Sequence, residues 1–257
     1  MKDLKVRLIT AVIGIIILVG VIKLGGLTLG LGTLFLSIVG LNEFYKALEN
    51  IDYKPIHWAG YISTIGLFLS IYFERITFQF VLIIMVLLLL IEFLFKDNIK
   101  IHDLGVTLLG VLYIPLSLMH IYLLDGDIFI ALVFLVGFGS DTFAYFAGNL
   151  FGKRKLSPKV SPNKSVEGSI GGIIGSIILA CVFNYIFVKQ AMWKFVIIGA
   201  LGSVVSQLGD LVASKIKRTA QIKDYGKLMP GHGGVLDRFD SIIFCGPLIY
   251  YSIDFLL

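Results

Sequence analysis

Residues Gln207–Asp240 read QLGDLVASKIKRTAQIKDYGKLMPGHGGVLDRFD and interrupt a chain that is otherwise largely hydrophobic. The stretch begins inside an apolar segment, leaves it through a basic cluster, crosses a glycine-rich loop and re-enters apolar sequence behind two aspartates. It holds four Asp, one His and six Lys or Arg residues. Folding alone does not require so many charges between two apolar runs, so the stretch indicates a functional site.

The composition around this stretch is that of a membrane protein. Of the 257 residues, 57% are hydrophobic and 15% are charged, whereas soluble domains are ~25% charged. The apolar runs are long enough to cross a ~30 Å hydrocarbon layer, and they are continuous rather than alternating, which argues against a β-barrel. We therefore expect an all-α, polytopic integral membrane protein that contacts the lipid bilayer.

The apolar runs predict about nine transmembrane helices. The candidate spans cover residues 8–23, 27–42, 56–73, 76–95, 104–123, 127–148, 168–188, 192–213 and 239–257. Eight or ten spans remain alternatives, because Gly25-Gly26 leaves only a very short turn between the first two. The first run lacks a convincing signal-peptidase site and further spans follow it, so it is interpreted as a retained helix.

The basic residues predict the orientation of the chain. Eighteen of the 22 Lys and Arg residues fall at the N-terminus or in alternate loops, and four fall on the other side. The asymmetry is still seven against four without the two longest loops. The positive-inside rule then predicts a cytoplasmic N-terminus and an outside C-terminus at the plasma membrane. The net charge of +5 is explained by these loops and by anionic ligands, so we expect no nucleic-acid partner.

The two halves of the chain differ in their chemistry. Residues 1–126 hold few polar groups, and we expect them to form scaffold helices that face lipid or a dimer partner. Glu43, near a span end in this half, is interpreted as an interfacial polar residue. Residues 127–257 are expected to form the catalytic region, with cytoplasmic loops at 149–167 and 214–238 and the active site on the cytoplasmic side.

Two predicted helices carry polar stripes. At 100° per residue, one stripe in the span 192–213 lies within about 80° and consists of Ser203, Gln207, Asp210, Ser214 and Lys217, with Arg218 beside it. The other follows the span 127–148 and consists of Gly137, Ser140, Asp141, Ala144, Tyr145 and Gly148. Ionisable residues at membrane depth usually face a cavity or a partner. For Asp210 the alternative is an interfacial ion pair with Lys215 or Lys217. For Asp141 a metal, a basic residue, a bound proton or a purely structural role all remain open.

The predicted loop Gly152–Gly168 reads GKRKLSPKVSPNKSVEG. Its five basic residues, four Ser or Asn residues and two Ser-Pro turns suit a phosphate-rich ligand, although a loop that merely sets topology would look similar. The helix after it carries Gly168, Gly171, Gly172 and Gly175. These overlapping G-x-x-x-G patterns predict close helix packing.

The loop before the last span combines glycines with two aspartates. Glycines let backbone N–H groups approach phosphate, and Asp237 and Asp240, three residues apart, share one helix face. Carboxylates beside basic residues are a usual setting for Mg²⁺ that bridges to phosphates. An acidic cap at a helix N-terminus is the alternative.

The sequence contains none of the motifs G-x-x-x-x-G-K-[ST], G-x-S-x-G, H-E-x-x-H or C-x-x-C. Cys181 and Cys245 lie inside apolar runs and indicate neither a disulfide nor a metal site. What remains is phosphoryl or nucleotidyl transfer to or from a lipid. A transporter that uses Asp141 and Asp210 is the alternative from a different class, but the charges gather on one side, which favours a one-sided site.

Two blocks of residues resemble a known family. The first block is Ser214-Lys215-Ile216-Lys217-Arg218, Lys223-Asp224, Gly226, Leu228, Pro230, His232-Gly233-Gly234 and Asp237-Arg238-Phe239-Asp240. The second is Asp141-Thr142-Phe143-Ala144-Tyr145, Gly148, Gly152-Lys153 and Ser161–Gly168. Together they cover roughly residues 137–241 and resemble the phosphatidate cytidylyltransferases, or CDP-diacylglycerol synthases.

This resemblance implies an enzyme that transfers the cytidylyl group of CTP to phosphatidate, giving CDP-diacylglycerol and pyrophosphate for phospholipid biosynthesis. It also implies a homodimer, a polar cavity and Mg²⁺ as cofactor, with a second, monovalent cation such as K⁺ as an open alternative. A CTP-dependent polyprenol or phytol kinase and a related CDP-lipid synthase remain alternative activities.

The resemblance also implies roles for individual residues. The catalytic candidates are Asp210, Asp237, Asp240, Lys217, Arg218 and His232. His232 is interpreted as a positioning group, because an ionised lipid phosphate needs no strong base. The metal candidates are Asp210, Asp237, Asp240 and Asp141. The substrate-binding candidates are Ser161, Asn163, Lys164, Ser165, Glu167, Gln207, Ser214, Lys223, Asp224, Gly233, Gly234, Arg238, Asp141 and Tyr145.

Overall fold

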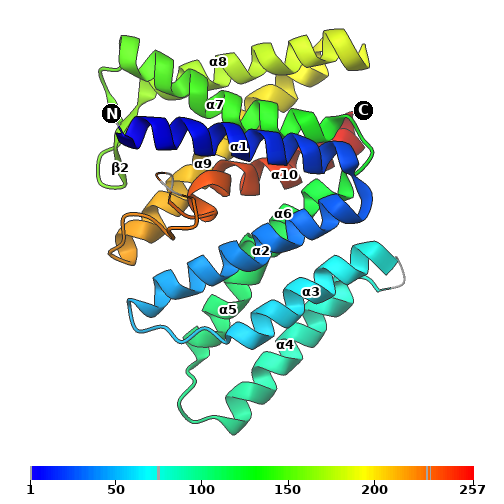
Figure 1. Ribbon diagram of the computed structural model, residues 1–257, viewed down its shortest axis with the longest axis vertical. Coiled ribbons are helices and arrows are strands. Elements are labelled where there is room, and N and C mark those ends of the chain that lie inside the picture. Colours follow the sequence, from blue (N-terminus) through cyan, green and yellow to red (C-terminus); the bar gives the residue numbers. More distant parts are fainter. Residues whose placement is uncertain (1, 74–75, 230, 232) are drawn as a thin grey trace. The chain divides into compact units, whose positions relative to one another are not determined.

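The computed structural model describes residues 2–73, 76–229, 231 and 233–257, with the backbone alone for residues 2–8. In this part of the chain, helices and one two-stranded sheet make up the regular structure (Figure 1). The helices are α1 Lys2–Leu24, α2 Gly26–Glu49, α3 His57–Phe73, α4 Phe78–Phe95, α5 Ile101–Tyr113, α6 Pro115–Leu123, α7 Phe129–Phe151, α8 Val166–Phe183, α9 Met192–Thr219 and α10 Leu236–Leu256. A π-helical turn, η1 Asn184–Val188, extends α8. The strands are β1 Lys155–Ser157 and β2 Ser161–Ser165.

Seven helical segments of the described chain are long and apolar enough to cross a membrane. They are Gly26–Glu49, Phe78–Phe95, Ile101–Leu123, Phe129–Phe151, Val166–Val188, Met192–Thr219 and Leu236–Leu256. The prediction of an all-α, polytopic membrane protein is therefore confirmed. The first predicted span lies in α1, where the shorter segment Ile9–Leu24 is apolar, and the third corresponds to the 17-residue α3, so the number nine stays a prediction.

Packing divides the chain into two compact units. The first unit consists of Met1–Asp125 and Thr219–Arg238, and the second consists of Gly126–Arg218 and Phe239–Leu257. The two regions expected from the sequence also meet near residue 126. The structure, however, groups most of the segment between α9 and α10 with the N-terminal helices rather than with the C-terminal ones.

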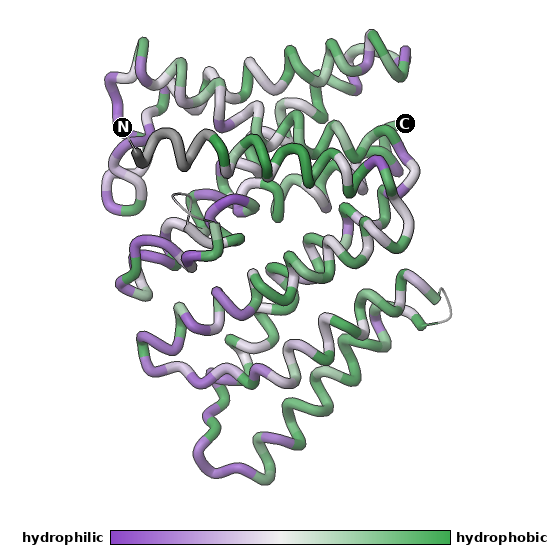
Figure 2. The backbone as a smooth tube through the Cα atoms, in the orientation of Figure 1, coloured by the Kyte–Doolittle hydropathy of each residue, from purple (hydrophilic) through white to green (hydrophobic). Residues whose placement is uncertain are grey.

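In the first unit, a proline divides one of the predicted spans. The span expected at 104–123 consists of α5 and α6, because Pro115 has no N–H to continue the hydrogen bonding of α5. The connections between α2 and α3 and between α4 and α5 are hydrophilic and lie at the same end of this unit (Figure 2). The N–H of Lys54 in the first connection donates to Asp103 Oδ1 at the start of α5, at 2.7 Å.

In the second unit, α7 and α8 lie side by side and pack through glycine (Figure 1). A Cβ at Gly168 would lie 2.8 Å from the carbonyl oxygen of Ala144. One at Gly171 would overlap Ala147, also on α7. Only a residue without a side chain allows such an approach, so the close packing predicted from the G-x-x-x-G patterns is confirmed.

The segment between α7 and α8, expected as a polar loop, contains an antiparallel β-hairpin. Strands β1 and β2 pair with Lys155 opposite Ser165 and Ser157 opposite Ser161. The Ser165 hydroxyl then caps α8 by accepting the N–H of Gly168 at 3.1 Å. The hairpin therefore runs directly into the first turn of α8, and this connection fixes where the side chains of the hairpin lie.

Candidate active site

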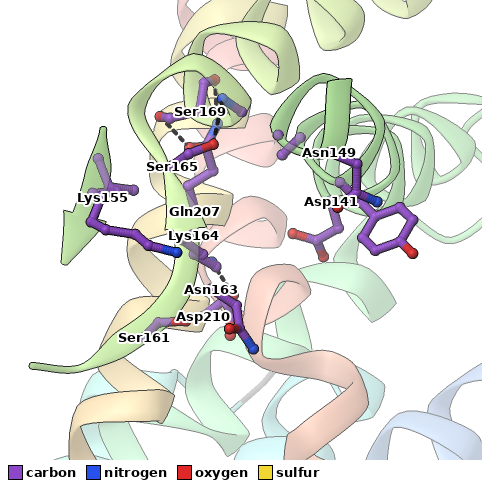
Figure 3. A pocket seen from close by; sticks show the side chains of 15 residues that line it. Asp141, Asn149, Lys155, Ser161, Asn163, Lys164, Ser165, Ser169, Gln207 and Asp210 are labelled. Atoms are coloured by element: carbon purple, nitrogen blue, oxygen red, sulfur yellow. Dashed lines mark hydrogen bonds and ion pairs between the residues drawn. The ribbon is translucent and has the colours of Figure 1, made fainter. Parts of the chain in front are cut away.

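The second unit contains a polar cavity of about 700 Å³ (Figure 3). Its walls come from α7, the β-hairpin, the start of α8 and the middle of α9. Eight of the substrate-binding and catalytic candidates line it: Asp141, Tyr145, Ser161, Asn163, Lys164, Ser165, Gln207 and Asp210. The structure thus brings residues of the second block together with Gln207 and Asp210 from the polar stripe of α9. Residues from the polar stripes of α7 and α9 face this cavity, and the hairpin forms another of its walls.

A buried hydrogen-bond network joins the three helices behind this cavity. Gln207 on α9 donates from Nε2 to the Ser203 hydroxyl and to the carbonyl oxygen of Ser169, both at 3.1 Å. The Ser169 hydroxyl donates back to Gln207 Oε1 at 2.5 Å. The Ser140 and Ser203 hydroxyls are 2.8 Å apart and fully buried. Because buried polar groups are costly unless they are paired, this network holds α7, α8 and α9 in one register.

Asp210 forms an ion pair with Lys164 of strand β2. The Ser214 hydroxyl, one turn later on α9, lies 3.4 Å from the other Asp210 oxygen. A salt bridge across the cavity to the hairpin was not among the partners considered for Asp210 from the sequence. Both partners of this ion pair line the cavity. A phosphate would compete with Asp210 for Lys164, and a metal ion would compete with Lys164 for Asp210.

Asp240 has like charges in its surroundings, all from the second unit. Asp240, near the start of α10, is buried, with 8% of its surface exposed, and it is repelled by the charges of Asp141 and Asp210. Its backbone lies against α9 at Gly209, where a Cβ would overlap the Asp240 carbonyl oxygen. Lys217, at the end of α9, contributes the opposing positive charge.

The described residues contain no group of three or more His, Cys, Asp or Glu side chains that could hold a metal ion by themselves. The chemistry of the donor set nevertheless fits Mg²⁺, which is usually bound by one or two carboxylates while substrate phosphates and water complete its shell. Asp210 and Asp141 line the cavity that such a ligand would fill. The metal assignment from the sequence stays a prediction.

Asp237 lies in the first unit, where it organises the loop before α10. Its Oδ2 accepts the N–H of Tyr225 at 2.8 Å and the N–H of Gly234 at 2.9 Å. Its side chain is buried, with 8% of the residue surface exposed. Gly233, beside it, has φ +86°, a conformation that favours glycine. Asp237 thus shapes the glycine-rich loop that the sequence placed next to it.

Glu43 differs from its prediction. It is 6% exposed rather than interfacial, and its two carboxylate oxygens accept the N–H groups of Val235 at 3.0 Å and Leu236 at 2.9 Å. The first N–H groups of a helix lack partners within that helix, so α10 begins at the Glu43 carboxylate. The sequence gives no sign of this pairing, because the partners are almost two hundred positions apart.

The other predicted residues lie around these elements. Glu167 accepts the N–H groups of Lys153 at 3.0 Å and Arg154 at 3.2 Å, and so anchors the chain where it enters the hairpin. Arg218 lies in the last turn of α9, with its Nε 3.5 Å from the carbonyl oxygen of Val160 in the hairpin turn. In the first unit, Lys223, Asp224 and Arg238 are exposed. His232 lies outside the described residues.

Three polar residues of the cavity lining were not among the candidates. Asn149, Lys155 and Ser169 line the cavity beside the predicted ones (Figure 3). Lys155 reaches it because β1 pairs with β2 in a register that sets it opposite Ser165. Without the hairpin, the five basic residues of this segment could not be separated into those that face the cavity and those that face away.

Comparisons with known proteins identify the family of this chain. A model of the cytidylyltransferase family matches residues 5–256. The chain is 37% identical over 256 residues to a phosphatidate cytidylyltransferase of Staphylococcus saprophyticus, covering 96% of this chain and 97% of that protein. Proteins of the same name from Staphylococcus haemolyticus and Staphylococcus aureus are 35% and 34% identical over 257 residues, with the same coverage. The chain therefore belongs to the cytidylyltransferase family.

Proposed function

We propose that this protein transfers the cytidylyl group of CTP to phosphatidate, giving CDP-diacylglycerol and pyrophosphate for phospholipid biosynthesis. The observation that carries the proposal is the cavity in the second unit, where Lys155 and Lys164 lie with Asp141 and Asp210 in a bundle of apolar helices. Relatives named phosphatidate cytidylyltransferase, similar over nearly the whole chain, support the same reaction.

The reaction joins two polyanions, so charge neutralisation and positioning would supply most of the rate enhancement. An oxygen of the lipid phosphate attacks the α-phosphorus of CTP, and the bond from this phosphorus to the β-phosphate oxygen breaks. Lys155 and Lys164 would hold the CTP phosphates, while Asn163 and Ser161 supply further polar contacts. The attacking phosphate is already ionised near neutral pH, so no strong general base is required.

Mg²⁺ is the cofactor that this donor set suits best. Asp141 and Asp210, which line the cavity, would hold it together with the substrate phosphates, with Asp240 as a further candidate, and bound Mg²⁺ would neutralise charge on the CTP phosphates. Asp237, three residues before Asp240 in the sequence, is a further candidate for this role. A monovalent cation such as K⁺ is a second candidate occupant, and a homodimer is the expected assembly.

Position-specific labelling tests the reaction. Purified protein is incubated with phosphatidate, Mg²⁺ and CTP labelled at either the α- or the γ-phosphorus. We expect the α-label in the lipid product and the γ-label in pyrophosphate. Transfer of the γ-label to a lipid would instead identify a CTP-dependent kinase and overturn the proposed reaction.

Metal removal tests the cofactor separately. We expect EDTA to abolish formation of CDP-diacylglycerol and Mg²⁺ to restore it, because the CTP phosphates and the cavity carboxylates Asp141 and Asp210 then lack a counter-ion. Asp210→Asn should lower kcat at least ~10²-fold at saturating Mg²⁺, as for the loss of a catalytic electrostatic group. Turnover that persists in EDTA would contradict the metal assignment.

A further inference from the structure

Glu43, on helix α2, binds the end of the loop that precedes α10, within the first block of family-like residues. Both of its carboxylate oxygens are engaged, one by the N–H of Val235 and the other by the N–H of Leu236. These amides open α10, so the positive end of the helix dipole also favours the buried carboxylate. The start of α10 is thus capped by a carboxylate from α2 rather than by a residue next to it in the sequence.

Two glycines of the loop fit around this carboxylate. A Cβ at Gly226 or at Gly234 would overlap the Glu43 side chain. Neither glycine has a positive φ, so backbone conformation does not require glycine at these positions. The close approach of Glu43 does require it, and this gives the two signature glycines a physical reason that is independent of phosphate binding.

A second carboxylate completes the arrangement. Asp237 takes the N–H of Gly234, the residue before those held by Glu43, and also the N–H of Tyr225. Consecutive amides at 234, 235 and 236 are therefore divided between Asp237 and Glu43. A shift of Glu43 would break its hydrogen bonds to the amides of Val235 and Leu236. The turn that holds the Asp237 carboxylate in place would then be less well fixed.

We propose that Glu43 is a positioning residue for the cytidylyl transfer, which holds the loop 225–237 and so sets the place of the Asp237 carboxylate. The inference rests on the proposed function only for its catalytic consequence. The contacts themselves lie within the first unit and can be tested without activity.

The kinetic test compares Glu43→Gln with two controls. The amide keeps the shape of the side chain but turns a donor toward one of the two N–H groups. We expect kcat to fall ~10- to 100-fold with a smaller change in KM for CTP, since misplacement by about 1 Å has effects of this size. Glu92→Gln removes a carboxylate from a surface pair with Lys96 in the same unit and should keep wild-type kcat.

Met85→Ala controls for general loss of stability, because Met85 is fully buried in α4. It should lower the melting temperature yet retain kcat at temperatures where the protein is folded. Wild-type kcat in Glu43→Gln would overturn the proposal. So would losses of kcat in Glu43→Gln and Met85→Ala that track their losses of stability.

A double-mutant cycle tests the contact with glycine. Gly234→Ala alone should lower kcat, since its methyl group overlaps the Glu43 carboxylate. In a Glu43→Ala background the same change should cost little more, because the obstacle is gone. Additive losses in the double variant would show that Gly234 serves a purpose unrelated to Glu43, and would overturn this part of the inference.

Hydrogen exchange separates the inference from the proposed function. In Glu43→Gln we expect the amides of Tyr225, Gly234, Val235 and Leu236 to exchange faster than in Met85→Ala. Equal exchange in the two variants would overturn the positioning role. If wild-type protein forms no CDP-diacylglycerol, the proposed function fails, but this exchange comparison still decides the role of Glu43.

Discussion

At the scale of single residues, Lys164 connects the basic side of the cavity, on the hairpin, with its acidic side chains on the helices. It forms an ion pair with Asp210. A nucleotide that brings phosphates and a cation would exchange both partners, so that Lys164 turns to phosphate and Asp210 to the metal. The ion pair therefore places the two groups that we propose to bind phosphate and metal next to each other.

Lys164→Gln is predicted to weaken CTP binding more than catalysis. Loss of a charge-assisted hydrogen bond removes about 1.5–3 kcal/mol, which corresponds to a KM for CTP raised roughly 10- to 100-fold. Initial-rate kinetics at varied CTP measure this change. Lys159→Gln, in the exposed turn of the same hairpin, is the matched control and should leave KM unchanged. Equal effects of the two changes would show that only the net charge of the hairpin matters.

The residues that sequence reasoning found and missed differ in one respect. Asp141 and Asp210 could be predicted because helical periodicity places each within a polar stripe of its own helix. Lys155 depends on the register of a hairpin, and Glu43 depends on contact between segments far apart in the chain. Periodicity carries no information on such contacts, so these two residues emerge only from the structure.

At the scale of elements, hydropathy located the helices better than their ends. Helix α9 continues to Thr219, beyond the predicted end at residue 213, because charges end an apolar run without breaking helical hydrogen bonds. Helix α10 begins at Leu236, three residues before its predicted span, where Glu43 supplies acceptors. The strands β1 and β2 were not predicted, because each is too short to give a clear alternating pattern. Their position also depends on Glu167, which accepts the N–H of Lys153 from fourteen residues along the chain.

Packing of α7 against α8 gives a prediction for this scale. Gly171→Ala should destabilise the protein by about 1–3 kcal/mol, as for overpacking of a tight interface, because its methyl group overlaps Ala147. Thermal unfolding in detergent measures the loss. Gly105→Ala, in α5, is the control, since a methyl group there meets nothing within 4 Å. If both variants unfold at the same temperature, the α7–α8 contact is not tightly packed.

At the scale of the whole molecule, composition is enough to predict a polytopic helical protein, and the seven long apolar segments of the described chain agree. The arrangement of contacts could not be predicted in this way. The structure assigns Thr219–Arg238 to the unit built from the N-terminal helices, although the signature in the sequence runs continuously from there into α10. Glu43 supplies a physical reason, because it binds this segment from α2.

Orientation in the membrane is the remaining prediction for the whole molecule. Lys159, in the hairpin turn, and Lys189, just after η1, lie at opposite ends of the membrane segment Val166–Val188 and are both exposed. With the excess of Lys and Arg inside, Lys159→Cys should react with a membrane-impermeant maleimide only after cells are opened. Lys189→Cys should react in intact cells. Wild-type protein, whose Cys181 and Cys245 lie within helices, measures the background. The reverse labelling pattern would place the hairpin, and the cavity that it closes, outside the cell, where CTP is not supplied by metabolism, and would contradict the orientation and the proposed function together.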